Sequence, residues 1–238
     1  DSLVDATPFK LPGSTRVIPQ SCGGSKITLT QALKDSCNPA FARLGAKLGA
    51  DALRAQAEKF GFGTAFLDDI GSVASVFPEE IDAAQTAMSA IGEFETKATP
   101  LQMAMVSAAI ANGGVVMDPY IVAEVLDGDL RTVSRTRPQQ QSVALDESNA
   151  KELRQMMVEV VSSGTGYRAQ IPGVVVGGKT GTARTSADRS PYAWFTAWAD
   201  DPSVAVCAFV EDADIPATEI AGGAVAAPIA KAVIEALR

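Results

Sequence analysis

Three strand-like runs in the C-terminal part of the chain constrain its fold more than any other feature. They cover 174–183, 192–199 and 203–210, and only short links separate them. Short links favour antiparallel neighbours, because a parallel connection needs a longer crossover. Aromatic and small apolar side chains fill both faces of the middle run, so neither face suits water. The sequence predicts an antiparallel sheet over 174–210 with helices covering both faces.

The segments around this sheet complete an α+β pattern. Helical periodicity and strand-like alternation divide them by type, and Asp127-Gly128 is typical of a hairpin turn. We expect one domain portion, 1–238, in these parts: an irregular lead-in rich in proline and glycine (1–27), helices (28–112, 146–162 and a C-terminal 226–238) and a strand and hairpin region (115–145).

Composition excludes several kinds of function. The 238 residues contain no histidine, which removes Ser-His-Asp and Cys-His triads and histidine-based zinc sites. Any catalysis must therefore use lysine, serine, carboxylates or cysteine, and we expect no metal and no cofactor. A net charge of −8 without a Lys/Arg block argues against nucleic acid as a partner.

The first strand-like run becomes polar halfway along. Three valines are followed by Gly177, Gly178, Lys179 and then Thr180-Gly181-Thr182. Glycines inside a strand mark a bulge or a ligand close to the backbone, and the lysine and hydroxyls would form an anion-binding edge. The alternative is an ordinary strand end with a solvated lysine.

The same run also matches a phosphate-binding pattern. Residues 173–180 fit G-x-x-x-x-G-K-[ST], but a P-loop lysine and threonine must open a helix whose amides face the phosphates. Here Gly181 follows at once, and the helix-poor segment 182–191 comes next. The sequence therefore disfavours nucleotide binding.

Ser36-Cys37-Asn38 forms a polar break between two predicted helices. Pro39 suits the first position of the second helix, and the simplest interpretation makes Asn38 its N-cap. Cys37 and Cys22 are close enough in sequence for a short-loop disulfide, although free thiols fit the composition equally well. Cys207 lies in an apolar run and is expected to be a small core residue.

Lys179-Thr180-Gly181 on a strand, with Ser36-Cys37-Asn38 upstream between helices, resembles the penicillin-binding-protein and serine β-lactamase superfamily. The resemblance is closest to class B, actinobacterial PbpA-type proteins, and it implies that 1–238 is the C-terminal portion of a transpeptidase domain. Segments similar to such domains follow the family order over essentially the whole chain: 8–15, 36–42, 99–104, 111–114, 164–166, 178–183, 222–223 and 226–229.

The resemblance implies a peptidoglycan D,D-transpeptidase that cross-links stem peptides by serine acyl transfer. The family's nucleophile lies in an S-x-x-K motif upstream of S-x-N, whereas the string Ser148-Asn149-Ala150-Lys151 lies downstream, at the start of a helix. We reject that string as the nucleophile motif. We expect the nucleophilic serine and its lysine in an upstream segment of a longer protein, and the alternative is a domain that has lost catalysis.

By resemblance, the residues of this chain take defined roles. Ser36 would relay a proton to the leaving amine, and Lys179 would supply positive potential. Asn38 would hold the substrate's amide carbonyl. The hydroxyls of Thr180 and Thr182 would bind the terminal carboxylate, and the Thr182 backbone N–H would form half of the oxyanion hole. Gly181 would leave room for the substrate backbone to approach.

The resemblance also implies partners and a location. D-Ala-D-Ala stem peptides, β-lactam antibiotics, the upstream segment and division or elongation proteins are the expected partners. The site would face the outside of the bacterial cell membrane, with an anchor in the upstream segment. Two other functions remain open: a non-catalytic substrate-binding or scaffold domain, and a β-lactamase or β-lactam sensor.

Overall fold

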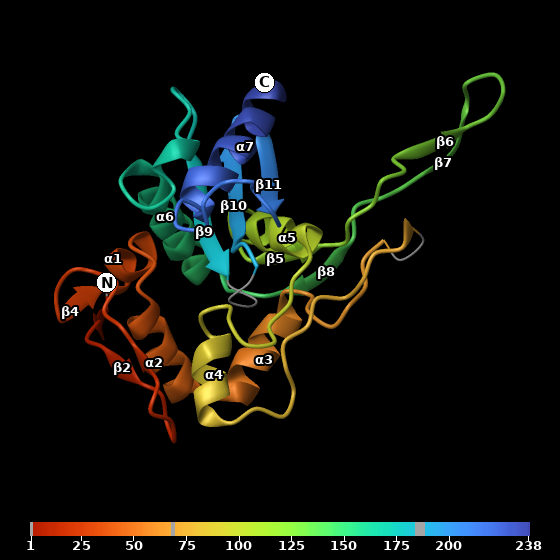
Figure 1. The fold of residues 1–238 in the computed structure, drawn as a ribbon. Coiled ribbons are helices and arrows are strands. Elements are labelled where there is room, and N and C mark those ends of the chain that lie inside the picture. The colour runs from red at the N-terminus through yellow and green to blue at the C-terminus, as the bar shows by residue number, and fades with distance from the viewer. Residues whose placement is uncertain (1, 68–69, 184–188) are drawn as a thin grey trace.

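A three-stranded antiparallel sheet lies at the centre of the fold (Figure 1). The structure is a computed structural model that describes residues 2–67, 70–183 and 189–238. The strand order β11-β10-β9 places β9 and β11 at the two edges, and the sheet predicted over 174–210 is confirmed. Its strands are β9 (Val176–Ala183), β10 (Tyr192–Asp200) and β11 (Ser203–Val210).

Helices cover both faces of the sheet, as the two apolar faces of β10 predict. Phe195 and its small neighbours on one face pack against the last helix, α7. Trp198, on the other face, packs with Ile110 and Met157 from two different helices, α5 and α6. These covering helices are α5 (Pro100–Ala111), α6 (Glu147–Ser162) and α7 (Gly222–Ala236).

The glycine pair in β9 has a packing role. Gly177 and Gly178 pair with β10 without a register shift, so the strand has no bulge at this point. A Cβ on Gly177 would collide with the indole of Trp198, and one on Gly178 would lie 2.5 Å from Phe195 Cζ. The prediction of a bulge here is therefore wrong. The glycines make room for the two largest buried side chains of β10.

A second, mainly helical region packs beside the sheet and carries the Ser36 segment (Figure 1). Its helices are shorter than the range 28–112 predicts, because the described residues of 61–82 contain no α-helix. The segment Thr99-Pro100-Leu101-Gln102 matches the capping-box pattern, but only half of the box forms. Thr99 Oγ1 accepts from the Gln102 backbone N–H, whereas the Gln102 side-chain amide donates to Phe60 O. The helices are α1 (Leu29–Lys34), α2 (Asn38–Leu48), α3 (Ala50–Lys59) and α4 (Ala83–Ser89).

Two predicted boundaries need correction. The lead-in 1–27 is not irregular throughout, because backbone pairing organises it into two small antiparallel sheets. The C-terminal helix begins at Gly222 rather than at 226, because two glycines let its first turn pack closely on β9 and β10. The strands of the lead-in are β1 (Leu3–Asp5), β2 (Phe9–Lys10), β3 (Val17–Ile18) and β4 (Lys26–Thr28).

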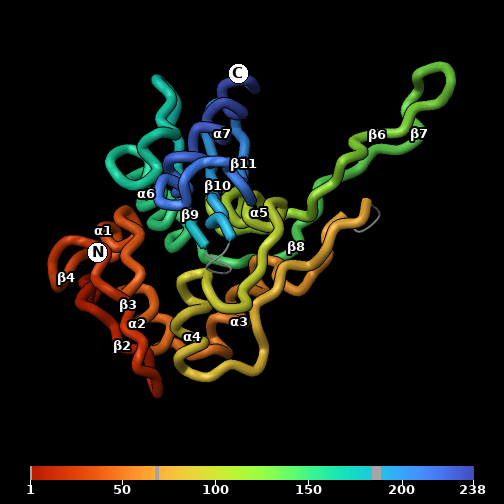
Figure 2. Tube along the Cα trace, viewed as in Figure 1, coloured from red at the N-terminus to blue at the C-terminus, as the bar shows by residue number. Residues whose placement is uncertain are grey.

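The predicted hairpin at Asp127-Gly128 is confirmed, and it extends away from the rest of the molecule (Figures 1 and 2). The antiparallel pair β5 and β8 lies at its base. No helix of the described residues is long and apolar enough to cross a membrane. The strands of this region are β5 (Val115–Met117), β6 (Glu124–Leu126), β7 (Thr132–Arg135) and β8 (Gln140–Val143).

Gly178→Ala should destabilise the fold by about 1 to 3 kcal/mol, because the new methyl group overpacks the contact with Phe195. Gly128→Ala is the matched control, since nothing lies within 4 Å of a Cβ at that position and its change should stay within about 0.5 kcal/mol. Urea unfolding of both variants measures the difference. Equal stabilities would contradict the packing role of Gly178.

Candidate active site

The side chains of Lys179 and Ser36, 143 residues apart in sequence, meet beside the central sheet. Lys179 Nζ donates hydrogen bonds to Ser36 Oγ at 2.8 Å and to the Thr180 carbonyl at 2.8 Å. Burial lowers the pKa of Lys179 from its ordinary 10.5 to about 8, because the charged ammonium loses solvation. The alternative of a solvated lysine is therefore excluded, and Lys179 has a defined partner.

Ser36 is held in an unusual backbone conformation between α1 and α2. Its φ of 56° lies in the left-handed region, which costs a non-glycine residue about 1 to 3 kcal/mol and is common at functional sites. The Ser36 N–H donates to Leu33 O at 3.2 Å, and the Cys37 N–H donates to Ala32 O at 2.8 Å. These bonds to the end of α1 fix the turn that presents the Ser36 hydroxyl to Lys179.

Asn38 is not the N-cap that the sequence suggests. The N-cap of α2 is Cys37, Asn38 is already the first helical residue, and no side chain caps this helix end. The Asn38 side chain is exposed at the cleft and has no hydrogen-bond partner among the described residues. Its amide is thus available to a ligand.

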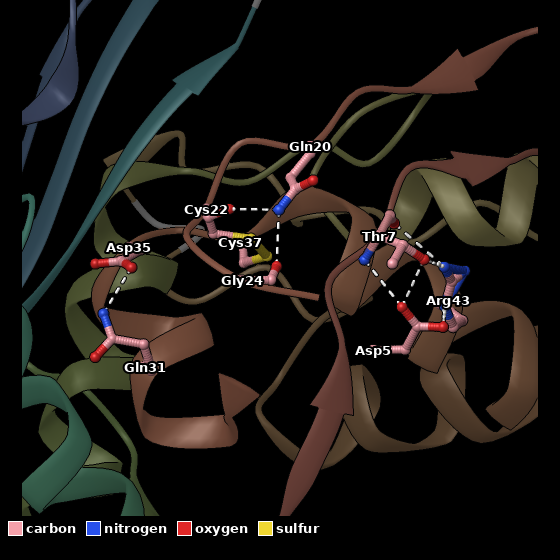
Figure 3. Close-up of a disulfide and its surroundings, with 9 residues drawn as sticks. All are labelled: Asp5, Thr7, Gln20, Cys22, Gly24, Gln31, Asp35, Cys37 and Arg43. Atoms are coloured by element: carbon pink, nitrogen blue, oxygen red, sulfur yellow. Dashed lines mark hydrogen bonds and ion pairs between the residues drawn. A yellow bond between two sulfur atoms is a disulfide. The ribbon is translucent and has the colours of Figure 1, made fainter. Parts of the chain in front are cut away.

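A disulfide joins Cys37, the central residue of the S-x-N motif, to Cys22 (Figure 3). Cys37 is fully buried, and the two Cα atoms lie 5.4 Å apart. The Gln20 amide donates to Cys22 O at 3.0 Å and to Gly24 O at 2.7 Å, which orders the loop that carries Cys22. The lead-in is thereby tied directly to the segment that carries Ser36 and Asn38.

The two threonines of β9 point to the face of the sheet opposite Lys179, because side chains alternate along a strand. Thr180 Oγ1 lies 2.8 Å from Thr165 Oγ1, and Thr182 Oγ1 accepts from the Gly222 N–H at 3.2 Å. Gly222 and Gly223 have no room for a Cβ, which would collide with the backbone of β9, β10 or Thr165. The first turn of α7 therefore lies directly against this part of β9.

A cleft of about 750 Å³ brings the predicted residues together. All six line it: Ser36, Asn38, Lys179, Thr180, Gly181 and Thr182. Other lining residues were assigned no role from the sequence. Thr165, Gly222 and Gly223 lie in segments that resemble the family, whereas Tyr167, Arg168 and Ala224 lie outside those segments. Periodicity could not reveal these residues, because they reach the cleft through packing of the 3₁₀ turn Tyr167–Ala169 on α7 and of α7 on β9.

Two sequence patterns prove unrelated to the cleft. Ser148 and Lys151 are exposed in the first turn of α6 and do not line it. Lys179 and Thr180 continue a strand and open no helix, so the phosphate-loop pattern has no structural basis. No cluster of three metal-ligating side chains occurs among the described residues.

Comparison with known proteins identifies the family. The penicillin binding protein transpeptidase domain matches residues 5–235. The chain belongs to this family. It is 40% identical to the peptidoglycan D,D-transpeptidase PbpA of Mycolicibacterium smegmatis over 98% of this chain and 50% of that protein. For PbpA of Mycobacterium tuberculosis the identity is 39%, over 99% of this chain and 50% of the relative.

Solved structures agree with this assignment. A ceftriaxone acyl-enzyme complex of M. tuberculosis penicillin-binding protein A matches with a TM-score of 0.91 and 35% identity, over 99% of this chain and 55% of that one. A D,D-transpeptidase domain from Eggerthella lenta matches with a TM-score of 0.84 and 30% identity, over 100% and 60%. The predicted family and fold class are confirmed, and the chain spans about half the length of the PbpA relatives.

The free energy of unfolding of the wild-type protein should rise with pH above pH 8, and Lys179→Met should abolish this rise. Between pH 8 and 10.5 the unfolded lysine binds a proton that the folded one has lost, so the free energy of unfolding increases with pH in this window. The increase should reach at most about 3 kcal/mol. Urea melts from pH 7 to 11 measure it, with the exposed Lys151→Met as control. Parallel curves for wild type and Lys179→Met would contradict the lowered pKa.

Cys22→Ser should lower the free energy of unfolding by about 3 kcal/mol under oxidising conditions, because the disulfide closes a loop with a sequence separation of 15. Reductant should bring wild type to a similar stability. A thiol titration of denatured, unreduced protein should find one free thiol, Cys207. Three free thiols would exclude the disulfide.

Proposed function

We propose that this chain forms the substrate-docking side of a serine D,D-transpeptidase that cross-links peptidoglycan stem peptides. The observation that carries the proposal is the 2.8 Å hydrogen bond from Lys179 Nζ to Ser36 Oγ, in a cleft that Asn38 and the Thr180–Thr182 stretch also line. The family membership and the relatives named D,D-transpeptidases support it. The alternatives, a non-catalytic domain or a β-lactam hydrolase or sensor, become outcomes of the test.

Ser36 and Lys179 suit proton transfer without histidine. A protonated lysine only donates, so it must bond a lone pair of Ser36 Oγ. The Ser36 O–H then remains free to give its proton to the leaving amine, while Lys179 Nζ transfers a proton to Ser36 Oγ in its place. The lowered pKa of Lys179, about 8, makes this exchange easier near neutral pH.

The free edge of β9 suits an extended peptide. Among the described residues β9 pairs with β10 on one side and with no strand on the other, so its second edge offers backbone N–H and C=O groups to an added strand. We assign the terminal carboxylate to the hydroxyls of Thr180 and Thr182, and half of the oxyanion hole to the Thr182 N–H. Gly181 keeps this edge open, and Asn38 faces the peptide carbonyl from across the cleft.

The nucleophilic serine and its activating lysine belong, in this proposal, to a segment upstream of residue 1. The edge strand β11 offers such a segment a place to pack, beside a pocket of about 360 Å³ between β11 and α5. A stable domain would then need both halves, and 1–238 would be the C-terminal portion of one transpeptidase domain.

Location and partners follow from the same proposal. The Cys22–Cys37 disulfide suits an oxidising compartment, which supports a site on the outer side of the cell membrane. Named complexes of the M. tuberculosis relative contain ceftriaxone, imipenem and penicillin G as acyl-enzymes, so we expect β-lactams to acylate this protein too. Division or elongation proteins would be its cellular partners.

Fluorescent penicillin should label the protein, expressed with all of its encoded segments, and intact mass should show one adduct on a serine upstream of residue 1. Ser36→Ala should slow acylation about 100-fold, because general acid–base catalysis contributes 10²–10⁴. Ser148→Ala, in the S-x-x-K string outside the cleft, is the control and should label normally. Absence of label on the complete protein would favour a binding domain, and rapid release of the label would favour a β-lactamase.

A further inference from the structure

The pleat of β9 separates the cations of the cleft from one another. Lys179 points to the Ser36 side and already donates to Ser36 Oγ and Thr180 O. Thr180 and Thr182 point to the opposite side, toward α7. Among the described residues that line the cleft, the basic ones are Lys179 and Arg168. Arg168 is therefore the cation on the threonine side.

Arg168 is positioned by contacts that leave part of its guanidinium available. Its Nε donates to Tyr167 Oη at 3.1 Å, and its Nη1 lies 3.5 Å from the carbonyl oxygen of Ala224, in the first turn of α7. No ion pair of the described residues includes Arg168, and its side chain is exposed. Its Nη2 can therefore donate to an anion in the cleft.

The segment that carries Arg168 is tied to the docking strand. Thr165 lies three residues earlier, its N–H donates to Lys34 O at 3.3 Å, and its hydroxyl contacts that of Thr180 at 2.8 Å. A Cβ on Gly223 would collide with Thr165 O, so α7 also packs directly on this turn. These contacts hold the backbone of the turn that carries Arg168 in place beside Thr180.

Two neutral hydroxyls bind a carboxylate by hydrogen bonds but do not balance its charge. A carboxylate that leaves water for a cleft needs a cation to offset the lost solvation. Lys179 lies on the other side of β9, where two of its three N–H donors are already bonded to Ser36 Oγ and Thr180 O. A guanidinium keeps its charge at every relevant pH and forms strong, directional bonds to carboxylates.

We propose that Arg168 binds the terminal carboxylate of the substrate together with Thr180 and Thr182, and so determines specificity for anionic peptide ends. This inference rests on the proposed function and adds a residue outside the S-x-N and K-T-G motifs. Arg168 enters at the binding step: it should tighten the complex before acylation and leave the acylation step unchanged.

The test uses Arg168→Gln in the complete protein, with penicillin G as the acylating probe. The pre-acylation dissociation constant should rise about tenfold to hundredfold, as expected for loss of a charge-assisted hydrogen bond. The acylation rate at saturation should stay within about twofold. Arg168→Lys should restore part of the affinity, and Arg137→Gln, an exposed arginine outside the cleft, should behave as wild type.

A second arm separates charge recognition from a structural role. D-Ala-D-Ala peptides with a free carboxylate or a terminal amide compete with penicillin labelling. Only competition by the carboxylate form should weaken in Arg168→Gln, and the melting temperature should not change. An unchanged dissociation constant, equal weakening for both peptides, or a loss confined to the acylation rate would overturn the proposal. A wild-type protein that takes no label would instead overturn the proposed function.

If Arg168→Gln fails to fold, Arg168→Lys decides the question. A lysine keeps the charge but loses the planar fork, so it should bind the carboxylate peptide more weakly than arginine and the amide peptide equally. Wild-type affinity of Arg168→Lys for both peptides would then overturn the proposal.

Discussion

The alternation of β9 is the constraint on which the site depends. Among the described residues β9 pairs only with β10, and its pleat places Lys179 on one face and Thr180 and Thr182, one and three residues later, on the other. A shift of register by one residue would exchange these faces and separate Lys179 from Ser36. Gly177 and Gly178 help to fix the register, because only glycine fits beneath Trp198 and Phe195.

Each face of β9 is then completed by a different part of the chain. The turn between α1 and α2 brings Ser36 to Lys179, and the disulfide from Cys22 supports that turn. On the other face, the first turn of α7 contacts Thr182 through the Gly222 N–H. Segments far apart in sequence thus form the cleft around β9, whose alternation of side chains follows from its own backbone conformation.

Local patterns predicted much of the fold. Strand-like runs with short links gave the antiparallel sheet, and Asp127-Gly128 gave the hairpin. Predictions were less accurate where they assumed that a polar side chain bonds the backbone of its own helix end. Asn38 looks like a cap, but the α2 N-terminus leaves its side chain at the cleft. The Gln102 amide bonds Phe60 O, 42 residues away, in place of completing a capping box. Tertiary partners compete with local ones wherever packing brings them close.

The sequence by itself determined the family, the absence of histidine chemistry and six residues of the cleft, because motif residues and composition are visible in one dimension. The tertiary structure decided how those residues meet: the Lys179–Ser36 bond, the lowered pKa of Lys179, and a cleft that Arg168 lines together with the two threonines. These depend on burial and on contacts across more than a hundred residues of chain, which no local periodicity encodes.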